Sequence, residues 1–146
     1  MTAASCASSP ARTDAATPAA MPALPQLLIV AAGGAAGACA RFALQQLPFD
    51  DSRRFCLTAL VNLAGSFLIG LAWALFDALG APRWASLLAI AGVLGGFTTF
   101  SAFSLETVRL LSEGRLAEAA GYVAVSTAGG IACCAAGIWL VNKILQ

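Results

Sequence analysis

One short segment of this chain carries residues whose types and spacing could act on an ion. Residues 95–104 read Gly-Gly-Phe-Thr-Thr-Phe-Ser-Ala-Phe-Ser, so two adjacent glycines precede several hydroxyls. The glycine pair weakens a helix, and the hydroxyls can bond to backbone groups that a break releases. Inside a membrane, such a break exposes carbonyls that can coordinate a cation and N–H groups that favour an anion. The segment therefore predicts a broken helix, which either lines a cavity or serves as a packing device.

Two phenylalanines follow the expected break and share one face of a helix. Phe100 and Phe103 are three residues apart, and the edges of their rings are electropositive. Two ring edges beside hydroxyl donors can line a route for a small anion. Judged by these residues alone, a stripe of rings that fills the space between helices is the more ordinary explanation.

Polar side chains also occur in two other apolar stretches. Asn62 lies several residues inside the stretch 55–76, where an unpartnered carboxamide costs several kcal/mol in hydrocarbon. A bond between helices, worth about 0.6–2 kcal/mol, explains it more simply than a place on an ion pathway. Tyr122 and Ser126 are four residues apart on one helix face, which indicates either a polar track or hydroxyls bonded to the preceding turn.

The composition excludes an ordinary soluble domain. Of the 146 residues, 60% are hydrophobic and 10% are charged, against about 45–50% apolar and about 25% charged in a soluble domain. The chain contains no His, so catalysis by His is excluded, and we expect no enzyme. A net charge of +1 offers no basic excess for binding nucleic acid.

Long uncharged stretches must position these side chains. They run over 15–40, 55–76, 84–105 and 119–142. A helix of about 22 residues spans about 33 Å, enough to cross a bilayer core of about 30 Å. We therefore expect an all-α membrane protein with four transmembrane helices and a break in the third. The expected helices cover about 25–46, 55–78, 84–107 and 117–142, and make up a domain of residues 24–146. Residues 1–23, rich in Ala, Ser, Thr and Pro, predict a disordered tail.

The charges on the two sides of the membrane are nearly balanced. Four spans place both termini on one side, with Arg12, Arg83 and Lys143, and leave Arg53, Arg54, Arg109 and Arg115 on the other. A clear excess of Lys and Arg is needed to set one orientation. The charges leave open a weak bias resolved by the first helix, or insertion both ways with antiparallel pairing. Arg41, near the far end of the first helix, is either an anchor or a vestibule charge that attracts anions.

Three motifs on successive apolar stretches together resemble the small fluoride channels of the Fluc (CrcB) family. They are Gly-Gly-Ala-Ala-Gly-Ala-Cys-Ala-Arg-Phe at 33–42, Val-Asn-Leu-Ala-Gly-Ser-Phe-Leu-Ile-Gly at 61–70, and the segment 95–104. The likeness covers most of residues 33–126. One such motif alone is weak evidence for a family. Three motifs in this order, on a chain of this length with four expected spans, are specific evidence.

The resemblance implies a passive, fluoride-selective channel of the inner (plasma) membrane that exports fluoride from the cytoplasm. It implies an antiparallel, dual-topology homodimer with two pores and a structural sodium ion, which the backbone carbonyls of Gly95 and Thr98 from both subunits would hold. The family's pore positions correspond here to Asn62, Thr99, Phe100, Ser101, Phe103, Tyr122 and Ser126, and its vestibule positions to Arg41 and Glu106.

The chain departs from the family pattern at two places near these positions. Ala102 stands where threonine is usual, which removes one hydroxyl, and Phe42 stands where tyrosine is frequent. Two other functions stay open. A small multidrug-type exporter would need a membrane-embedded acid in the first helix, but residues 15–49 contain none. A non-conducting membrane scaffold would use Asn62 and the hydroxyls to join helices.

Overall fold

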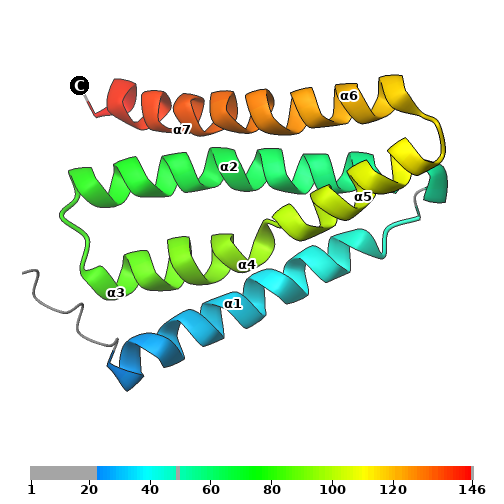
Figure 1. The fold of residues 1–146 in the computed structure, drawn as a ribbon. Coiled ribbons are helices and arrows are strands. Elements are labelled where there is room, and N and C mark those ends of the chain that lie inside the picture. The colour runs from blue at the N-terminus through cyan, green and yellow to red at the C-terminus, as the bar shows by residue number, and fades with distance from the viewer. Residues whose placement is uncertain (1–22, 49, 146) are drawn as a thin grey trace, which may run out of the picture.

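Four long helical segments lie side by side in the protein, as Figure 1 shows. The structure is a computed structural model that describes residues 23–48 and 50–145, so residues 1–22 of the expected tail at 1–23 lie outside the described residues. The segments cover Leu24–Gln45, Asp51–Ala78, Arg83–Ser112 and Leu116–Ile144, and each is long and apolar enough to cross a membrane. An all-α architecture with four apolar spans is thereby confirmed.

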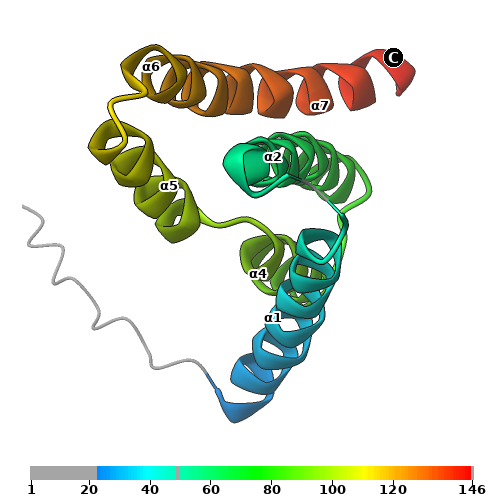
Figure 2. The ribbon, with the colours of Figure 1, turned by 90° about the vertical axis from the view of Figure 1, so that its right-hand side faces the viewer.

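The first two spans are continuous helices. Helix α1 (Leu24–Gln45) has a proline in its first turn, where the missing N–H costs little. A single 3₁₀ turn, η1 (Asp51–Arg53), precedes α2 (Arg54–Ala78). Both helices begin one residue before the expected positions. Helix α2 lies centrally, with α7 along one side and the α1–α4 pair on the other (Figure 2).

The third span is broken, and it ends later than expected. It consists of α3 (Arg83–Ser86), the π-helical η2 (Leu87–Leu94), α4 (Gly95–Phe97) and α5 (Phe100–Ser112). The backbone is extended at Thr98, with ψ of 156°, and at Thr99, with ψ of 117°. The helix therefore breaks after the glycine pair and not on it. Its last residue is Ser112, where the uncharged stretch had suggested an end near 107.

One glycine of the pair, Gly96, serves close packing in this structure. A Cβ atom built on Gly96 would lie 2.5 Å from the carbonyl oxygen of Gly34 and 3.0 Å from its Cα. Only glycine thus allows α4 to lie this close to α1, which is the use of small residues in membrane helix pairs. A Cβ on Gly95 would meet only the oxygen of Ile90, at 3.5 Å.

The fourth span carries a second π-helical stretch near its middle. It runs from α6 (Leu116–Ala124) through η3 (Val125–Gly129) to α7 (Gly130–Ile144). Glycines again set the packing, because a Cβ on Gly70 or on Gly137 would collide with backbone atoms of the facing helix. The start of α1, the turn between α2 and α3, and the end of α7 lie at one end of the molecule (Figure 1).

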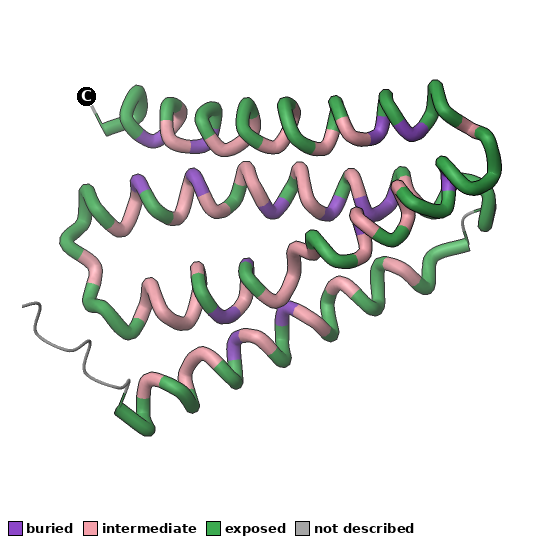
Figure 3. Tube along the Cα trace, in the orientation of Figure 1, coloured by how far each residue is buried: buried purple, intermediate pink, exposed green. Residues whose placement is uncertain are grey.

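Many large apolar side chains of the described residues are exposed on the single chain. Figure 3 shows buried positions only along the inner lines of the helices, and leucine, valine, isoleucine and tryptophan side chains cover the outside. Hydrocarbon can surround such a surface, and water cannot without cost. One cluster of buried residues joins α5 to α6, and comprises Phe103, Leu110, Ala119 and Tyr122.

Candidate functional site

Asn62 holds the break in the third span at two points. Its Oδ1 accepts a hydrogen bond from the backbone N–H of Thr99 over 2.8 Å, and its Nδ2 donates to the carbonyl oxygen of Thr99 over 2.9 Å. Both bonds connect α2 to a residue that has left helical geometry. The expectation that Asn62 bonds between helices agrees with this contact. These two bonds use the amide oxygen and one of its two N–H groups, so the second N–H of Asn62 is left over.

Two carbonyls next to the break lose their helical donors. In an uninterrupted helix the N–H of Thr99 would donate to the oxygen of Gly95, and the N–H of Ala102 to the oxygen of Thr98. Here Thr99 N–H donates to Asn62, while Ala102 N–H donates to Oγ1 of Thr99 over 3.2 Å. The oxygens of Gly95 and Thr98 are therefore released from the helix ladder, and these are the two oxygens that the sequence resemblance assigns to a sodium ion.

An open cavity of about 270 Å³ lies between the break, α2 and η3. Its lining is mostly apolar, but it contains an amide and several hydroxyl groups, for which we call it the polar cavity. Its lining combines side chains from all three elements, namely Asn62, Gly65, Ser66, Ile69, Thr98, Thr99, Phe100, Phe103, Ser126 and Thr127. Within the described chain, Oγ of Ser126 is buried and has no hydrogen-bond partner. A buried hydroxyl without a partner is rare, because it loses its bonds to water. The Ser126 hydroxyl is thus available to something that enters the cavity.

The site residues expected from the sequence divide into two groups. Asn62, Thr99, Phe100, Phe103 and Ser126 line the polar cavity together. By contrast, Ser101 and Tyr122 do not line it. The hydroxyl of Ser101 lies 3.2 Å from that of Thr99, and Tyr122 lies behind Phe103. The cavity also contains Ser66 and Thr127, which the sequence analysis did not select.

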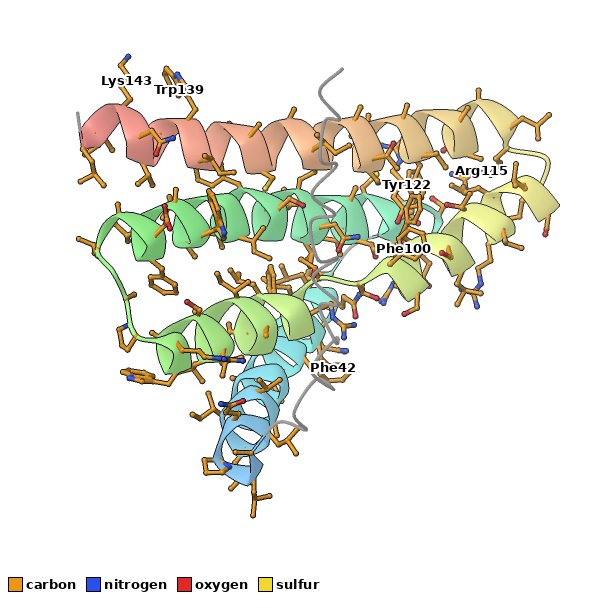
Figure 4. All side chains as sticks on the ribbon, turned by 60° about the vertical axis from the view of Figure 1, so that its left-hand side comes forward. Phe42, Phe100, Arg115, Tyr122, Trp139 and Lys143 are labelled. Atoms are coloured by element: carbon orange, nitrogen blue, oxygen red, sulfur yellow. The ribbon has the colours of Figure 1, made fainter. Side chains whose placement is uncertain are left out.

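Four aromatic rings form a continuous row beside the cavity. The ring centroids of Phe100 and Phe103 are 5.4 Å apart, those of Phe103 and Tyr122 are 5.2 Å apart, and those of Tyr122 and Phe55 are 5.3 Å apart. Phe103 is buried, whereas 76% of Phe100 is exposed. Figure 4 shows Phe100 and Tyr122 near Arg115, far along the bundle from Trp139 and Lys143.

Glu106 is fixed between two hydroxyl donors. The hydroxyl of Tyr122 donates to Oε2 over 2.6 Å, and Oγ1 of Thr58 donates to Oε1 over 2.8 Å. Thr58 is 1% exposed, so this bond satisfies a buried polar group. Thr58 was not expected from the sequence. Because Thr58 precedes Asn62 by one helical turn and shares its face, this spacing could have indicated it as a site residue.

The second vestibule candidate, Arg41, lies next to the break. Its Nε donates to the carbonyl oxygen of Gly96 over 3.4 Å. In a continuous helix the N–H of Phe100 would bond that oxygen, but Phe100 begins a new helix. Arg41 is half-buried and does not line the outer cavity described next, which contains Glu106.

An open outer cavity of about 510 Å³ lies at the end of the molecule where the first and third loops meet. It is lined by Asp51, Ser52, Arg54, Phe55, Glu106, Arg109, Leu110, Glu113 and Arg115. Its lining includes both acidic and basic side chains, and Arg54 pairs with Asp51 over 2.6 Å. Glu106 belongs to this lining and also reaches the ring row, so it stands where the two regions meet.

Arg115 ties the two loops of the outer cavity together. It donates to Glu118 over 2.6 Å, to Glu113 over 3.1 Å and to the backbone oxygen of Ser52 over 3.0 Å. Its guanidinium carbon also lies 5.7 Å from the centre of the Phe55 ring. The bonds to Glu118 and then Glu113 raise the pKa of Arg115 above its ordinary value. Nearby, hydrogen bonds from Ser52 lower the pKa of Asp50 below its ordinary value.

Comparison with known proteins relates this geometry to one family. The model of the CrcB-like protein, Camphor Resistance (CrcB) family matches residues 28–138. A "Fluoride-specific ion channel FluC" of Bordetella petrii is 50% identical over 112 residues, which cover 76% of this chain and 87% of that protein. A protein of the same description from Leptospira interrogans serovar copenhageni is 43% identical over 122 residues, covering 80% of this chain and 94% of its own. One from Hyphomonas neptunium is 41% identical over 124 residues, covering 80% and 95%. The matched residues include every side chain that lines the polar cavity.

Proposed function

The chain belongs to the CrcB-like protein family, and from that premise we propose that it is a passive, fluoride-selective channel of the inner membrane. The polar cavity beside the break is the observation that carries this proposal. It combines an amide, a buried unpartnered hydroxyl and aromatic rings, and none of its lining residues is charged. Such a lining suits a small anion that accepts several hydrogen bonds.

Fluoride would exchange part of its water for these donors. The remaining N–H of Asn62, the hydroxyl of Ser126 and the ring edges of Phe100 and Phe103 are several donors of moderate strength. An ion passes quickly only if binding is favourable enough for entry and weak enough for release. A larger halide would be excluded because it fits the cavity less well and accepts hydrogen bonds less strongly. Glu106 and Arg41 would act at the vestibules.

An antiparallel, dual-topology dimer would complete the pathway. Phe100 is 76% exposed on a single chain, and Gly95 is also exposed, so the break lies open on one side. A route for an ion must be closed off from the hydrocarbon, because a desolvated ion there has no partners. A second copy in the opposite orientation would cover this side and bring the two breaks together. The near balance of basic residues on the two sides is compatible with insertion in both orientations.

The break also fits a structural sodium ion. The carbonyl oxygens of Gly95 and Thr98 have lost their helical donors. Together with the same two oxygens of a partner, they would supply four hard ligands. Bound there, a cation would add positive charge near both pores. The chain's own contribution is to hold these oxygens in place through the bonds of Asn62 and Thr99. Fluoride would then flow down its own gradient, which would lower the cytoplasmic concentration.

Fluoride flux from liposomes tests the proposal. Purified protein is reconstituted into vesicles loaded with fluoride, and a fluoride electrode records efflux after a potassium ionophore removes the opposing voltage. We expect rapid efflux without a proton gradient, no efflux from protein-free vesicles, and retention of chloride in parallel vesicles. A small multidrug-type exporter would release fluoride no faster than empty vesicles and would require a proton gradient for its own substrate. A non-conducting scaffold would release neither anion.

A further inference from the structure

We propose that Asn62 is a positioning residue for the cation site, in addition to its place on the ion pathway. This inference rests on the proposed function, because it concerns the sodium ion expected at Gly95 and Thr98. The amide of Asn62 is the group that takes the N–H of Thr99 away from the oxygen of Gly95. By holding that N–H, Asn62 keeps a cation ligand available on a neighbouring helix.

Each backbone N–H near the break needs an acceptor within its reach. A buried N–H inside a membrane must have a partner, since an unpaired one costs several kcal/mol. Without the Asn62 oxygen, the nearest alternative for Thr99 N–H is its helical acceptor, the oxygen of Gly95. Forming that bond would extend the helical hydrogen bonding of α4 by one residue and occupy a lone pair of the ligand oxygen. The loss of Asn62 would therefore reach the cation site through the backbone.

Thr99 protects the second ligand in the same way. Its Oγ1 accepts the N–H of Ala102 and so caps the start of α5, which leaves the oxygen of Thr98 without that helical donor. A hydroxyl is all that this cap requires, so serine can replace threonine here and valine cannot. Each ligand oxygen of the break is thus kept available by one side chain, Asn62 for Gly95 and Thr99 for Thr98.

Asn62 also bonds the oxygen of Thr99, so it restrains the two peptide groups on either side of the Thr99 Cα. Thr98 is held separately, since its hydroxyl donates to the oxygen of Leu94 over 3.0 Å and its methyl group packs against Gly65. The extended geometry of the break is therefore determined by side-chain bonds on both of its residues. The proposal predicts that removal of these bonds weakens cation binding even where the fold persists.

Sodium-dependent thermal stability tests this inference without measuring conduction. The full-length protein is purified in detergent, and its unfolding midpoint is titrated with NaCl against N-methylglucamine chloride at constant ionic strength. We expect Asn62→Ala and Thr99→Val to need about 10–100-fold more sodium for half of the stabilisation, as is typical when a group that orients a metal ligand is removed. Thr99→Ser should respond as the wild type does. Phe103→Ile should lose flux in vesicles yet keep the wild-type sodium response.

The outcomes separate this inference from the proposals on which it rests. A wild-type sodium response in Asn62→Ala would overturn it. If Asn62→Ala does not fold, the Thr99 pair decides, because equal responses of the valine and serine variants would also overturn it. A wild-type protein without any sodium response would remove the cation site and this inference together, while fluoride efflux would still support the channel. An absence of efflux from wild-type vesicles, with a sodium response intact, would instead refute the channel proposal alone.

Discussion

Tyr122 and Glu106 are joined by a hydrogen bond of 2.6 Å that connects α6 to α5. Thr58 on α2 donates to the other oxygen of the same carboxylate, so three helices meet at one acid. Glu106 lies six residues before the end of the third span at Ser112, about 9 Å along the helix axis. Its charge is therefore placed inside the span, at the junction of the outer cavity and the ring row.

Removal of the Tyr122 hydroxyl should slow fluoride flux. In Tyr122→Phe the carboxylate of Glu106 would keep only Thr58 as a donor, and its less compensated charge would repel an entering anion. A hydrogen bond to a charged group is worth about 1.5–3 kcal/mol, so we expect a decrease of about tenfold or more. The measurement is electrode-detected efflux from vesicles. Thr107→Val is the control, since the Thr107 hydroxyl bonds only the oxygen of Phe103 in its own helix, and wild-type flux in both variants would contradict the role of Tyr122.

Phe100→Ile and Phe103→Ile should both reduce fluoride flux, but only Phe103→Ile should clearly lower the stability of the subunit. Phe103 is buried between Phe100 and Tyr122, so Phe103→Ile leaves a gap and lowers stability by about 1–3 kcal/mol. Phe100 is 76% exposed on the single chain, so Phe100→Ile removes few contacts within it. Each variant should keep the oligomeric state of the wild type by size-exclusion chromatography with light scattering, and each should lose most of its fluoride efflux. Undiminished efflux in both would place the rings outside the pathway.

The sequence predicted the architecture well because a chain that crosses hydrocarbon must do so as long, uncharged helices. Uncharged stretches long enough to span a bilayer predicted four helices, and the structure contains four such spans. The third helix extended beyond its uncharged stretch to Ser112, because Glu106 finds its bonding partners on other helices. Residue types alone gave no sign of those partners. Charges near a span therefore mark its end less reliably than their absence marks its interior.

The details of the site were less accessible from the sequence. The motif at 95–104 located the break, but it did not show which residues would be extended. These residues are Thr98 and Thr99, whereas Gly96 of the glycine pair stays helical and contacts Gly34. Asn62 was correctly expected to bond between helices, although its partner is backbone, which no side-chain pattern reveals. Thr58 and Phe55 entered the site only through tertiary contacts with Glu106 and Tyr122.

Ser126 should contribute to flux more than to stability. Its buried Oγ has no partner among the described residues, and such a hydroxyl costs the fold about 1–3 kcal/mol. Ser126→Ala should therefore leave the thermal midpoint unchanged or raise it, and should reduce fluoride efflux because a donor to the ion is lost. Ser112→Ala removes a hydroxyl that bonds the oxygen of Val108 in its own helix, and serves as the control. A lower midpoint with full efflux in Ser126→Ala would assign this hydroxyl to packing.

Arg115 should stabilise the end of the molecule that contains the outer cavity. Arg115→Lys keeps the charge but loses the planar fork that reaches Glu118, Glu113 and Ser52 together. Because 26% of the Arg115 side chain is exposed, water screens its ion pairs, and we expect only a small decrease in the thermal midpoint. Lys143→Arg, at the opposite end beside Trp139, is the matched exchange and should leave the midpoint unchanged.

Gly34 and Gly37, three residues apart on α1, should respond differently to substitution by alanine. A Cβ on Gly37 would collide with the carbonyl oxygen of Val93 and lie 2.8 Å from the N of Phe97, and neither backbone atom can move without displacing the third span. A Cβ on Gly34 would meet nothing within 4 Å in the same chain. We expect Gly37→Ala to lower stability by about 1–3 kcal/mol through overpacking, and Gly34→Ala to have no such effect on the subunit.

Thermal unfolding of both glycine variants in one detergent measures this difference, and sodium titration extends it. Because Phe97 directly precedes the break, displacement of the third span by Gly37→Ala would also move Gly95 and Thr98 relative to Asn62. The sodium response should then weaken in Gly37→Ala, although its hydrogen-bonding side chains are all present. Equal midpoints for the two variants would mean that the packing of α1 against the third span does not set the position of the break, which would then depend on the side-chain bonds of Asn62, Thr98 and Thr99.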